Sequence, residues 1–501
     1  MLAHVAASGV KSLSSPRLTP FGFPSWEKVG CRAAWRGKRG EILNGFSNLN
    51  RTEIAGLVQF VGFLLMAHIE PFRAFRFDAT RVALAEVATQ PYDKITPTMQ
   101  DRYYAASPYN LVKIILGKRQ TSDGPENNPY TRAAKSFREW RQEGILRQDA
   151  EPSIYRYVQR FAAPSPSTND ALQFERQGFI ALGKIEDYSA GVVFRHEQTL
   201  AKPKADRLDL LRATRAHFGQ IFMLYSDPGD GIEQALASAD SPTMEMTDEY
   251  GVSHRVWRVS DSRSIETVRN KMRDKKLIIA DGHHRYETAL TYRNERRAAE
   301  NEGPGLAPRE FVMMTFVKME SPGLLILPTH RVIRGLPNFS ADDFRASAAK
   351  FFTVDEADHS VSPERVSSML RQAGQTGTAI VAAIRDRVFL LSRPKNSEEV
   401  FKNVSVRQQG LDVVQLHKCL LEQALGISEA AIRDQTNVTY VRDAGEALNS
   451  VRSGEANVAF LMNPVRMEQV RDIAFAGEVL PQKSTDFYPK LLSGLTIYAL
   501  E

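Results

Sequence analysis

Cysteine is nearly absent from this chain. Its 501 residues include only Cys31 and Cys419, which lie far apart and form no CxxC pair. A disulfide framework needs several cysteines in an oxidising compartment, and a zinc cluster needs closely spaced Cys or His pairs. The sequence therefore indicates neither kind of site, and the simplest location for the protein is a reducing cytoplasm.

Long apolar runs are also lacking. The longest, residues 54–67, has 14 residues and is interrupted by Gln59, whereas a membrane-spanning helix needs about 20 mostly apolar residues. Hydrophobic residues make up 43% of the chain and charged residues 25%, which is typical of a soluble protein. We expect no membrane role.

A strong excess of one charge is missing too. The net charge is +6, but residues 1–65 hold eight Lys and Arg against three Glu, and the rest of the chain has 57 basic against 56 acidic residues. Nucleic-acid binding usually needs a basic surface, and the sequence has no helix-turn-helix pattern. We expect a small-molecule substrate and no nucleic-acid partner.

The chain is long enough for two or three domains. Residues 1–65 are rich in Ser, Gly and Arg and show no helical or strand period. We interpret them as unstructured or as an over-extended gene start before Met66, although a transit peptide has a similar composition. Hydrophobic patterning predicts a main α/β domain over residues 66–340 and a second, smaller α/β domain over residues 341–501.

The strongest functional signal is the segment from Leu277 to Leu290. Its apolar residues 277–280 predict a buried strand, Asp281-Gly282 predicts a turn, and residues 286–300 have helical spacing. A helix that begins in such a turn presents free backbone N–H groups, and its dipole favours an anion.

The side chains of this turn suit the same chemistry. Gly282 allows a ligand to approach the backbone, and Arg285 can donate two charge-assisted hydrogen bonds to a phosphate or carboxylate. His283 and His284 titrate near neutral pH, and Asp281 can orient Mg²⁺ or deprotonate a hydroxyl. A turn needs none of these groups for folding alone, so we interpret the segment as an active site.

Other polar residues lie at predicted strand ends or in loops. His196 and Glu197 end one strand and precede a cation-rich loop, and a second His-Arg pair ends another strand, where α/β sheets collect ligands. A Lys-Ser-Thr loop has one charge and two hydroxyls for phosphate, without the glycines of a P-loop. The candidate residues are Asp93, His196, Glu197, Lys202, Lys204, Arg207, His330, Arg331, Lys483, Ser484 and Thr485.

Several further elements are predicted from periodicity and from capping residues. Residues 96–106 and 130–143 have helical patterns, the first with Thr96 as its cap. Residues 110–116 have the short apolar pattern of a strand, and residues 378–391 predict a hairpin.

Five of these motifs together resemble a bacterial and archaeal family known as a domain of unknown function, ten-fifteen in that series. The similarity runs from about Met66 to the C-terminus, and it implies no particular reaction. The matching pieces are Pro91-Tyr92-Asp93, His196-Glu197 with Lys204-Ala205-Asp206-Arg207, the segment Ile279–Thr288, Pro328-Thr329-His330-Arg331, and Lys483-Ser484-Thr485 with Phe487-Tyr488-Pro489-Lys490.

A shorter stretch is similar to a second group. Asp281-Gly282-His283-His284-Arg285 at the start of a helix resembles the phosphate-binding motif of ParB-like and sulfiredoxin-like proteins, which include archaeal free-serine kinases. The resemblance implies a ParB/sulfiredoxin-like core and phosphate binding by residues 281–285. It identifies no catalytic Glu, a role open to Asp93 or Glu197.

The leading hypothesis is a mixed α/β enzyme that moves a phosphoryl group between a nucleotide, ATP or ADP with Mg²⁺, and a small polar acceptor such as a hydroxy-amino acid. Phosphoryl transfer depends mainly on positioning and charge neutralisation, which cations and helix N-termini supply. Arg285 and His284 offset charge in this hypothesis, and Asp281 binds the metal. More distant phosphate contacts come from His196, Lys202, Lys204, Arg207, Arg331, Lys483, Ser484 and Thr485.

Two alternatives stay open. A metal-dependent hydrolase would use His196, Asp281, His283, His284 and His330 as ligands, although adjacent histidines on one helical turn face different ways. A regulator that binds a nucleotide without turnover is the third possibility. A single site requires that Asp281, Arg285, His196, Arg207 and His330 line one cleft.

Overall fold

The structure of the chain is a computed structural model that describes residues 67–164, 172–198, 202–238, 240–395 and 398–501. The expected N-terminal extension, residues 1–65, lies outside the described residues. The segment Met66–Glu501 forms one compact unit. It is built on two sheets, one of nine strands and one of six.

The larger sheet is mixed, because β11 pairs in parallel with β6, β12 pairs in parallel with β8, and its other pairings are antiparallel. Strands β8 and β12 are buried along their whole length and β11 along all but its last residue, which suits a covered sheet. The strands, in spatial order, are β6 (Val193–Phe194), β11 (Leu277–Asp281), β8 (Ile221–Tyr225), β12 (Phe311–Lys318), β5 (Gln173–Lys184), β4 (Ile154–Ala162), β10 (Ser253–Val259) and β9 (Met244–Thr247), with β1 (Ile69–Glu70) paired to β5.

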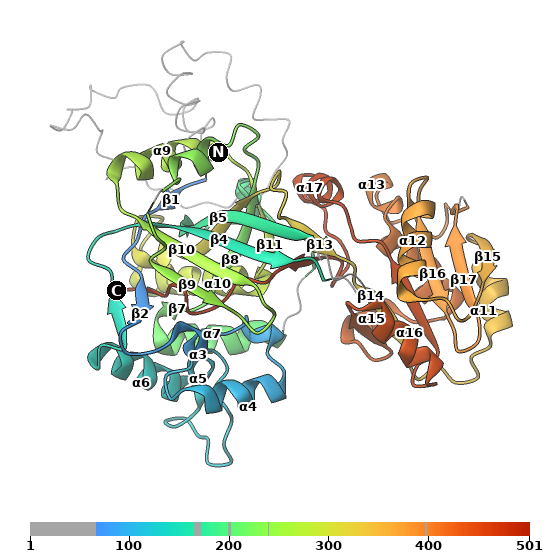
Figure 1. Cartoon of the computed structure of the whole chain (residues 1–501), viewed down its shortest axis with the longest axis horizontal. Helices are drawn as coiled ribbons and strands as arrows, with labels where there is room; N and C mark the ends of the chain where they lie inside the picture. The colour runs from blue at the N-terminus through green and yellow to red at the C-terminus, as the bar shows by residue number, and fades with distance from the viewer. Residues whose placement is uncertain (1–66, 165–171, 199–201, 239, 396–397) are drawn as a thin grey trace, which may run out of the picture. The chain divides into compact units, whose positions relative to one another are not determined.

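Helices surround this sheet (Figure 1). Helices α9 and α10 pack apolar residues against one face of the sheet. The opposite face belongs to the cluster that includes apolar residues of the C-terminal segment 480–498, whereas α5, α6 and α7 belong to a separate cluster that contains no strand of this sheet. These helices are α3 (Leu84–Val87), α4 (Pro97–Ala106), α5 (Val112–Ile115), α6 (Pro129–Gln142), α7 (Lys202–Thr214), α8 (Gly231–Ala235), α9 (Ser262–Met272) and α10 (His283–Glu300), with the 3₁₀ turns η2 (Tyr92–Lys94), η3 (Tyr188–Ala190) and η4 (Pro308–Glu310).

The smaller sheet is antiparallel throughout. Its strands, in spatial order, are β15 (Thr353–Ala357), β17 (Val388–Ser392), β16 (Ala379–Ala383), β19 (Val458–Met462), β14 (His330–Ile333) and β18 (Val438–Val441). Its helices are α11 (Ala341–Ala348), α12 (Pro363–Gly374), α13 (Val406–Gln409), α14 (Asp412–Gln415), the π-helix η5 (Leu416–Ala424), α15 (Glu429–Asp434), α16 (Ala444–Arg452) and α17 (Met467–Phe475).

The segment after α17 returns to the larger sheet. Its strand β20 (Asp486–Tyr488) pairs with β13 (Leu325–Leu327), and β21 (Tyr498–Ala499) pairs with β7 (Ala216–His217). A third small pair joins β2 (Phe75–Phe77) to β3 (Leu146–Gln148). The C-terminal segment therefore pairs with strands that come much earlier in the sequence.

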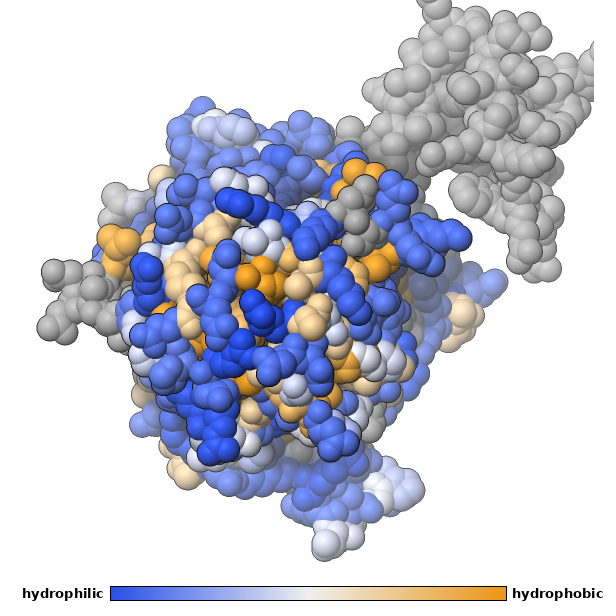
Figure 2. Space-filling model, turned by 90° about the vertical axis from the view of Figure 1, so that its right-hand side faces the viewer, coloured by the Kyte–Doolittle hydropathy of each residue, from blue (hydrophilic) through white to orange (hydrophobic). Residues whose placement is uncertain are grey.

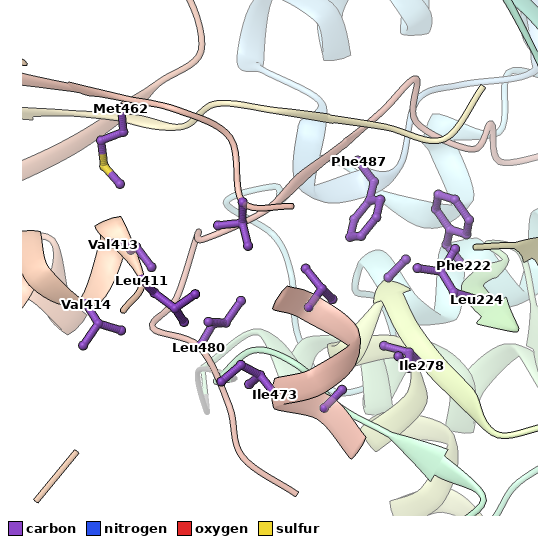
Figure 3. Packing of buried hydrophobic residues seen from close by; sticks show 14 of the residues in the cluster. Phe222, Leu224, Ile278, Leu411, Val413, Val414, Met462, Ile473, Leu480 and Phe487 are labelled. Atoms are coloured by element: carbon purple, nitrogen blue, oxygen red, sulfur yellow. The ribbon is translucent and has the colours of Figure 1, made fainter. Parts of the chain in front are cut away.

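One apolar core connects the two sheets through this returning segment (Figure 3). Phe222 and Ile278 of the larger sheet contribute to the same cluster as Leu480 and Phe487 of the returning segment, and the cluster continues to Met462 of the smaller sheet. Each of these side chains is at most 3% exposed. Since a buried large apolar side chain contributes about 1.5–3 kcal/mol, the cluster fixes the returning segment firmly.

The exposed surface is ordinary for a protein with such a core. The face shown in Figure 2 is mostly hydrophilic, with apolar residues scattered between charged ones. In the described part of the chain, no helix is long and apolar enough to span a membrane.

The mixed α/β class expected from the sequence is confirmed. The helices predicted at residues 96–106 and 130–143 form as α4 and α6, and Thr96 accepts a hydrogen bond from the Met99 N–H as its cap. The hairpin forms as β16 and β17. The strand predicted at residues 110–116 is wrong, because this segment contains the helix α5.

Candidate functional site

The turn at Asp281 has the predicted order of strand, turn and helix. Asp281 ends β11, Gly282 is the N-cap of α10 with φ of 91°, and α10 begins at His283. Oδ1 of Asp281 accepts a hydrogen bond of 2.8 Å from the Gly282 N–H. The carboxylate is thereby fixed at the N-terminus of an 18-residue helix.

Gly282 has a packing role as well as a conformational one. A Cβ at this position would lie 2.9 Å from Nε of Arg285, and positive φ disfavours any other residue. The Arg285 guanidinium thus lies directly over the glycine. It donates to the Gln220 carbonyl and brings Nη2 to 3.9 Å from Oδ2 of Asp281.

Asp281 also belongs to a chain of alternating charges. Nζ of Lys490 lies 3.6 Å from Oδ2 of Asp281 and 3.0 Å from Oδ1 of Asp486, and Nη2 of Arg442 lies 2.6 Å from Oδ2 of Asp486. Burial alone would raise the pKa of Asp281, but Lys490, Arg285 and Lys94 together hold that pKa well below its usual range. Asp281 is therefore a stable anion and a weak base.

His196 joins two distant segments. Its side chain is fully buried, with Nδ1 2.7 Å from the Ile279 carbonyl and Nε2 2.7 Å from Oγ1 of Thr485. Because a carbonyl only accepts, Nδ1 carries the proton. Burial lowers the pKa of His196 to about 4, so Nε2 is unprotonated at neutral pH and accepts the Thr485 hydroxyl proton.

The neighbouring Glu197 is held by the same loop. Oε1 of Glu197 accepts a hydrogen bond from the Lys483 N–H, and Oε2 lies 3.9 Å from Nε2 of His196. Burial raises the pKa of Glu197 to about 7. Its carboxylate therefore gains and loses a proton at the pH where a general base is most effective.

The two histidines of the turn have buried ring nitrogens without partners. Neither Nε2 of His283 nor Nδ1 of His284 has a hydrogen-bond partner within the described residues. Burial lowers the pKa of both rings, and the His283 ring lies 5.0 Å from the His196 ring. Because unpaired buried polar atoms are costly, these nitrogens fit contacts to a bound ligand.

A small cavity of about 70 Å³ lies beside Arg285. Arg207 contributes a second cation to its wall, and Thr288 contributes a hydroxyl that is buried without a hydrogen-bond partner among the described residues. Arg207 is 9% exposed and stacks over the Tyr92 ring at 4.1 Å. The Arg207 guanidinium pairs with Asp206 and donates to the Ile115 carbonyl at 2.6 Å. The cavity therefore combines the positive charge of Arg285 with an unsatisfied hydroxyl.

The remaining predicted residues near the turn are placed as follows. Lys204 pairs with Glu287 of α10 and contributes to the electrostatic environment of His284, as does Asp93 from η2. The side chain of Lys202 lies outside the described residues. Lys483 is exposed, whereas the Ser484 hydroxyl donates to the Pro481 carbonyl at 2.6 Å.

The second His-Arg pair does not join the turn. His330 lines a different cavity, described below. Arg331 is 1% exposed, and it donates to the Thr329 carbonyl and, at 3.1 Å, to the Lys483 carbonyl. Arg331 therefore stabilises the loop of Lys483 through its backbone. Of the residues expected in one cleft, Asp281, Arg285, His196 and Arg207 lie in one region and His330 lies elsewhere.

Sequence reasoning gave no role to Lys94, Lys490, Asp486 or Arg442. Lys94 directly follows the motif Pro91-Tyr92-Asp93, and Lys490 ends the motif Phe487-Tyr488-Pro489-Lys490. Their position beside or within these motifs was the only sequence feature that pointed to them. Burial lowers the pKa of Lys94, whereas for Lys490 the carboxylates of Asp281 and Asp486 outweigh burial and raise the pKa. Their electrostatic roles appear only once the distant segments are brought together.

Metal binding by protein side chains alone has little geometric basis. In residues 67–501 with the gaps noted above, no group of three or more His, Cys, Asp or Glu is arranged to hold a metal ion. Both ring nitrogens of His196 are engaged, and Nδ1 of His330 accepts from the Met462 N–H at 3.3 Å. The side-chain cations around Asp281 also repel a metal ion.

Comparison with known proteins identifies one family. The family described as "Protein of unknown function (DUF1015)" matches residues 69–414. This confirms the family expected from the motifs, although the loop at Lys483 lies beyond the matched residues. No curated protein matches the chain.

Several solved structures have some similarity. A conserved hypothetical protein from Pyrococcus furiosus has 12% identity and a TM-score of 0.32 and covers 61% of this chain and 91% of its own. A free serine kinase in complex with AMP has 12% identity, a TM-score of 0.30 and coverage of 61% and 89%. SbnI from Staphylococcus aureus, with a C-terminal truncation, has 10% identity, a TM-score of 0.31 and coverage of 64% and 87%.

Proposed function

We propose a phosphoryl-transfer function for this chain, which belongs to the DUF1015 family of unknown function. The observation that carries the proposal is the cluster of Lys490, Arg285 and Lys94 around Asp281 at the N-terminus of α10. Phosphoryl transfer needs charge neutralisation and positioning more than covalent catalysis, and a helix N-terminus with fixed cations supplies both.

The nucleotide phosphates would bind at the start of α10. The backbone N–H groups after Gly282 and the guanidinium of Arg285 are the direct contacts, and the orphan nitrogens of His283 and His284 fit further contacts to phosphate oxygens. Lys483, exposed on the opposing loop, adds a flexible cation. The hydroxyls of Ser484 and Thr485 donate within the protein, so they are unsuited as phosphate donors.

Mg²⁺ would enter with the nucleotide. Because cations surround Asp281, this carboxylate holds a metal only when phosphate oxygens and water supply most of the ligands, which is the usual mode of Mg²⁺ binding. The metal would neutralise charge on the transferring group. Without the nucleotide we expect weak Mg²⁺ binding.

The base in this proposal is Glu197. Its pKa of about 7 lets it accept a proton from an acceptor hydroxyl at neutral pH, whereas the ion pairs of Asp281 make that carboxylate a weak base. Asp93, exposed in η2, stays a second candidate. His196 and Thr485 act on Glu197 indirectly, by fixing the loop from which Lys483 donates to it.

The acceptor would be small and polar. The cavity beside Arg285 has a volume of about 70 Å³, and one water molecule in the liquid occupies roughly 30 Å³. The cavity therefore fits a group of a few heavy atoms. Arg285 favours a carboxylate, whereas Arg207 is already paired with Asp206. The unsatisfied Thr288 hydroxyl favours a hydrogen-bonding group. The carboxylate group of a free hydroxy-amino acid meets these requirements.

A thermal-shift screen of the full chain tests the proposal. The ligands are ATP, ADP, CTP, GTP and pyrophosphate, each with and without Mg²⁺, on the wild type and on Arg285→Ala. Ligand at 100 times its Kd stabilises a fold by about 2.7 kcal/mol, which gives a visible shift. Arg296→Ala is the matched control, because Arg296 lies on the same helix and pairs with Glu300 on its exposed face.

The outcomes separate the hypotheses. A nucleotide-dependent shift that Arg285→Ala removes and Arg296→Ala retains supports phosphate binding at this site, and an acceptor screen with that nucleotide then measures turnover. Binding without turnover across the acceptor screen indicates the regulator. Zinc and manganese salts are screened alone beside the nucleotides. A shift with either metal and with no nucleotide contradicts the proposal in favour of the hydrolase.

A further inference from the structure

A second, much larger cavity lies at one edge of the six-stranded sheet. Its volume is about 1060 Å³, which is enough for a ligand of nucleotide size. His330 at the start of β14 lines it, together with the residues that follow β18 and β19 and parts of α12. None of these residues belongs to the turn at Asp281.

The topology makes this edge suitable for ligands. β14 runs antiparallel to both β18 and β19, so β18 and β19 run parallel to one another on either side of it. Both therefore end at the same edge, and each is followed by a helix, α16 or α17, whose N-terminus lines the cavity. Carboxyl ends of neighbouring strands with helix N-termini beside them form a common crevice for anionic ligands.

His330 supplies a donor between these two strand ends. It is 3% exposed, and its Nδ1 accepts a hydrogen bond from the Met462 N–H. Burial lowers the pKa of His330 to about 4, so at neutral pH the ring is neutral and its proton is on Nε2. No hydrogen bond engages Nε2 within the described residues, so this buried side chain has an N–H without a protein acceptor in the wall of the cavity.

Cations complete the wall. Arg371 of α12 and Arg466, the N-cap residue of α17, line the cavity, and neither forms an ion pair with a described residue. Glu364, Asp412 and Asp443 also line the cavity. Asp443 caps α16 through the Glu446 N–H at 2.7 Å, and Asp412 accepts from the Ala379 N–H and interacts electrostatically with Arg466. The N-terminus of α17 is the place where the helix dipole and Arg466 act together on an added anion.

Part of the wall is apolar. Leu327, Leu411, Met462 and Val465 line this space from three segments of the chain. A wall of this kind stabilises the uncharged body of an organic molecule, which free phosphate does not have. The cavity therefore combines an anion-binding end with an apolar side.

We propose that this cavity is a second ligand site that binds a phosphate-bearing organic molecule, with the phosphate at His330, Arg466 and the N-terminus of α17. The site is separate from the proposed phosphoryl-transfer site and does not depend on that proposal. Arg442 lines the cavity and also pairs with Asp486, so the two sites share one ion-pair chain.

Isothermal titration of the full chain tests this site with three probes: AMP, glycerol 3-phosphate and inorganic phosphate. Arg466→Ala removes the proposed phosphate contact, and Arg471→Ala is the matched control, since Arg471 lies on the same helix and pairs with Asp472 instead. We expect an organic phosphate to bind the wild type more tightly than inorganic phosphate does, and Arg466→Ala to weaken that binding about tenfold, a loss of about 1.4 kcal/mol.

Hydrogen–deuterium exchange locates the bound probe. Binding at this site slows exchange at residues 458–469 in the wild type and also in Arg285→Ala, which removes the other site. The proposal is overturned if none of the three probes gives binding that Arg466→Ala weakens at millimolar concentration, or if Arg285→Ala alone abolishes all binding. The second result would leave the phosphoryl-transfer site intact as the only phosphate site.

Discussion

His196 accepts a hydrogen bond from Thr485 at 2.7 Å across a separation of 289 residues. The Nδ1 proton of the same ring is held by the Ile279 carbonyl, two residues before Asp281. A single neutral imidazole thus joins three distant segments of the chain. The loop that carries Lys483 is fixed beside the turn by this contact, by the bond from the Lys483 N–H to Glu197 and by the bond from the Leu480 N–H to the His196 carbonyl. Arg331 also donates to the Lys483 carbonyl.

Thr485→Val tests this contact. The valine has nearly the shape of threonine but cannot donate, so Nε2 of His196 is left buried without a partner. We expect the free energy of unfolding, measured by urea denaturation, to fall by about 1–3 kcal/mol. Thr485→Ser retains the hydroxyl and should lose clearly less; equal losses for the two variants would contradict the hydrogen-bond account.

Glu197→Gln tests the proposed base. The amide keeps the shape and accepts the Lys483 N–H but cannot take a proton. Loss of a general base typically reduces rate by 10²–10⁴-fold, so we expect kcat of phosphoryl transfer to fall by about that range while nucleotide affinity is retained. The wild-type rate should rise with pH up to about 7, where Glu197 ionises. A mutant that keeps the full rate and this pH profile would rule out Glu197 as the base.

The same residue predicts a pH dependence of stability. Burial raises the pKa of Glu197 from 4.5 to about 7, so the folded state binds the proton more tightly than the unfolded state. Its contribution to stability is present below pH 4.5 and is lost as pH rises through 7, by about 3 kcal/mol in total. We expect Glu197→Gln to stabilise the protein at pH 8 relative to wild type and to have little such effect at pH 4.5, as measured by urea unfolding at both values.

Lys490→Met tests the chain of charges. The substitution removes the buried cation between Asp281 and Asp486, so that Asp281 keeps only Arg285 and Asp486 keeps only Arg442 as an ion-pair partner. Removal of one partner from a buried ion pair typically costs about 3–5 kcal/mol. Lys490→Arg keeps the charge and is the control. The double variant with Asp486→Asn should recover part of the loss in urea unfolding, because one of the two carboxylates that faced Lys490 is then neutral. Strictly additive losses would show that Lys490 and Asp486 are not coupled.

Gly282→Ala tests the packing at the turn. A methyl group at φ of 91° and 2.9 Å from Nε of Arg285 forces the guanidinium away, with a backbone cost of about 1–3 kcal/mol. We expect weaker nucleotide binding in the thermal-shift screen along with the lower stability. Gly303→Ala is the control, since a Cβ there meets no atom within 4 Å, and a similar effect in both variants would refute the role of Arg285 packing.

The local structure around the turn was predictable because it depends on neighbouring residues. The apolar run before Asp281 and the turn residues themselves predict a strand, turn and helix, and β11 and α10 confirm this order. The prediction at residues 110–116 was wrong for a physical reason. A buried helix of one turn has the same apolar composition as a strand, and the Asn110 side chain accepts from the Val112 N–H at the start of α5.

The assembly of the site was not predictable from sequence patterns. The sequence shows that His196 and Thr485 are polar residues in suggestive places, but no local pattern tells that they touch. The same holds for Lys490, whose charge matters only because the returning segment places it against Asp281. His330 shows the opposite error. Its motif resembles the others in the sequence, but the fold places His330 in the wall of a separate cavity.

The returning segment also has a consequence for how the protein is made. Leu480 through Lys490 complete the surroundings of Glu197, His196 and Asp281, all of which leave the ribosome about 200 or more residues earlier. In the nascent chain the site is therefore incomplete, and its histidines and carboxylates stay exposed to solvent until residue 490 has emerged. Contacts that distant in sequence also form slowly. Premature termination anywhere before Lys490 is thus expected to yield a chain that lacks the site, even where the nine-stranded sheet has already folded.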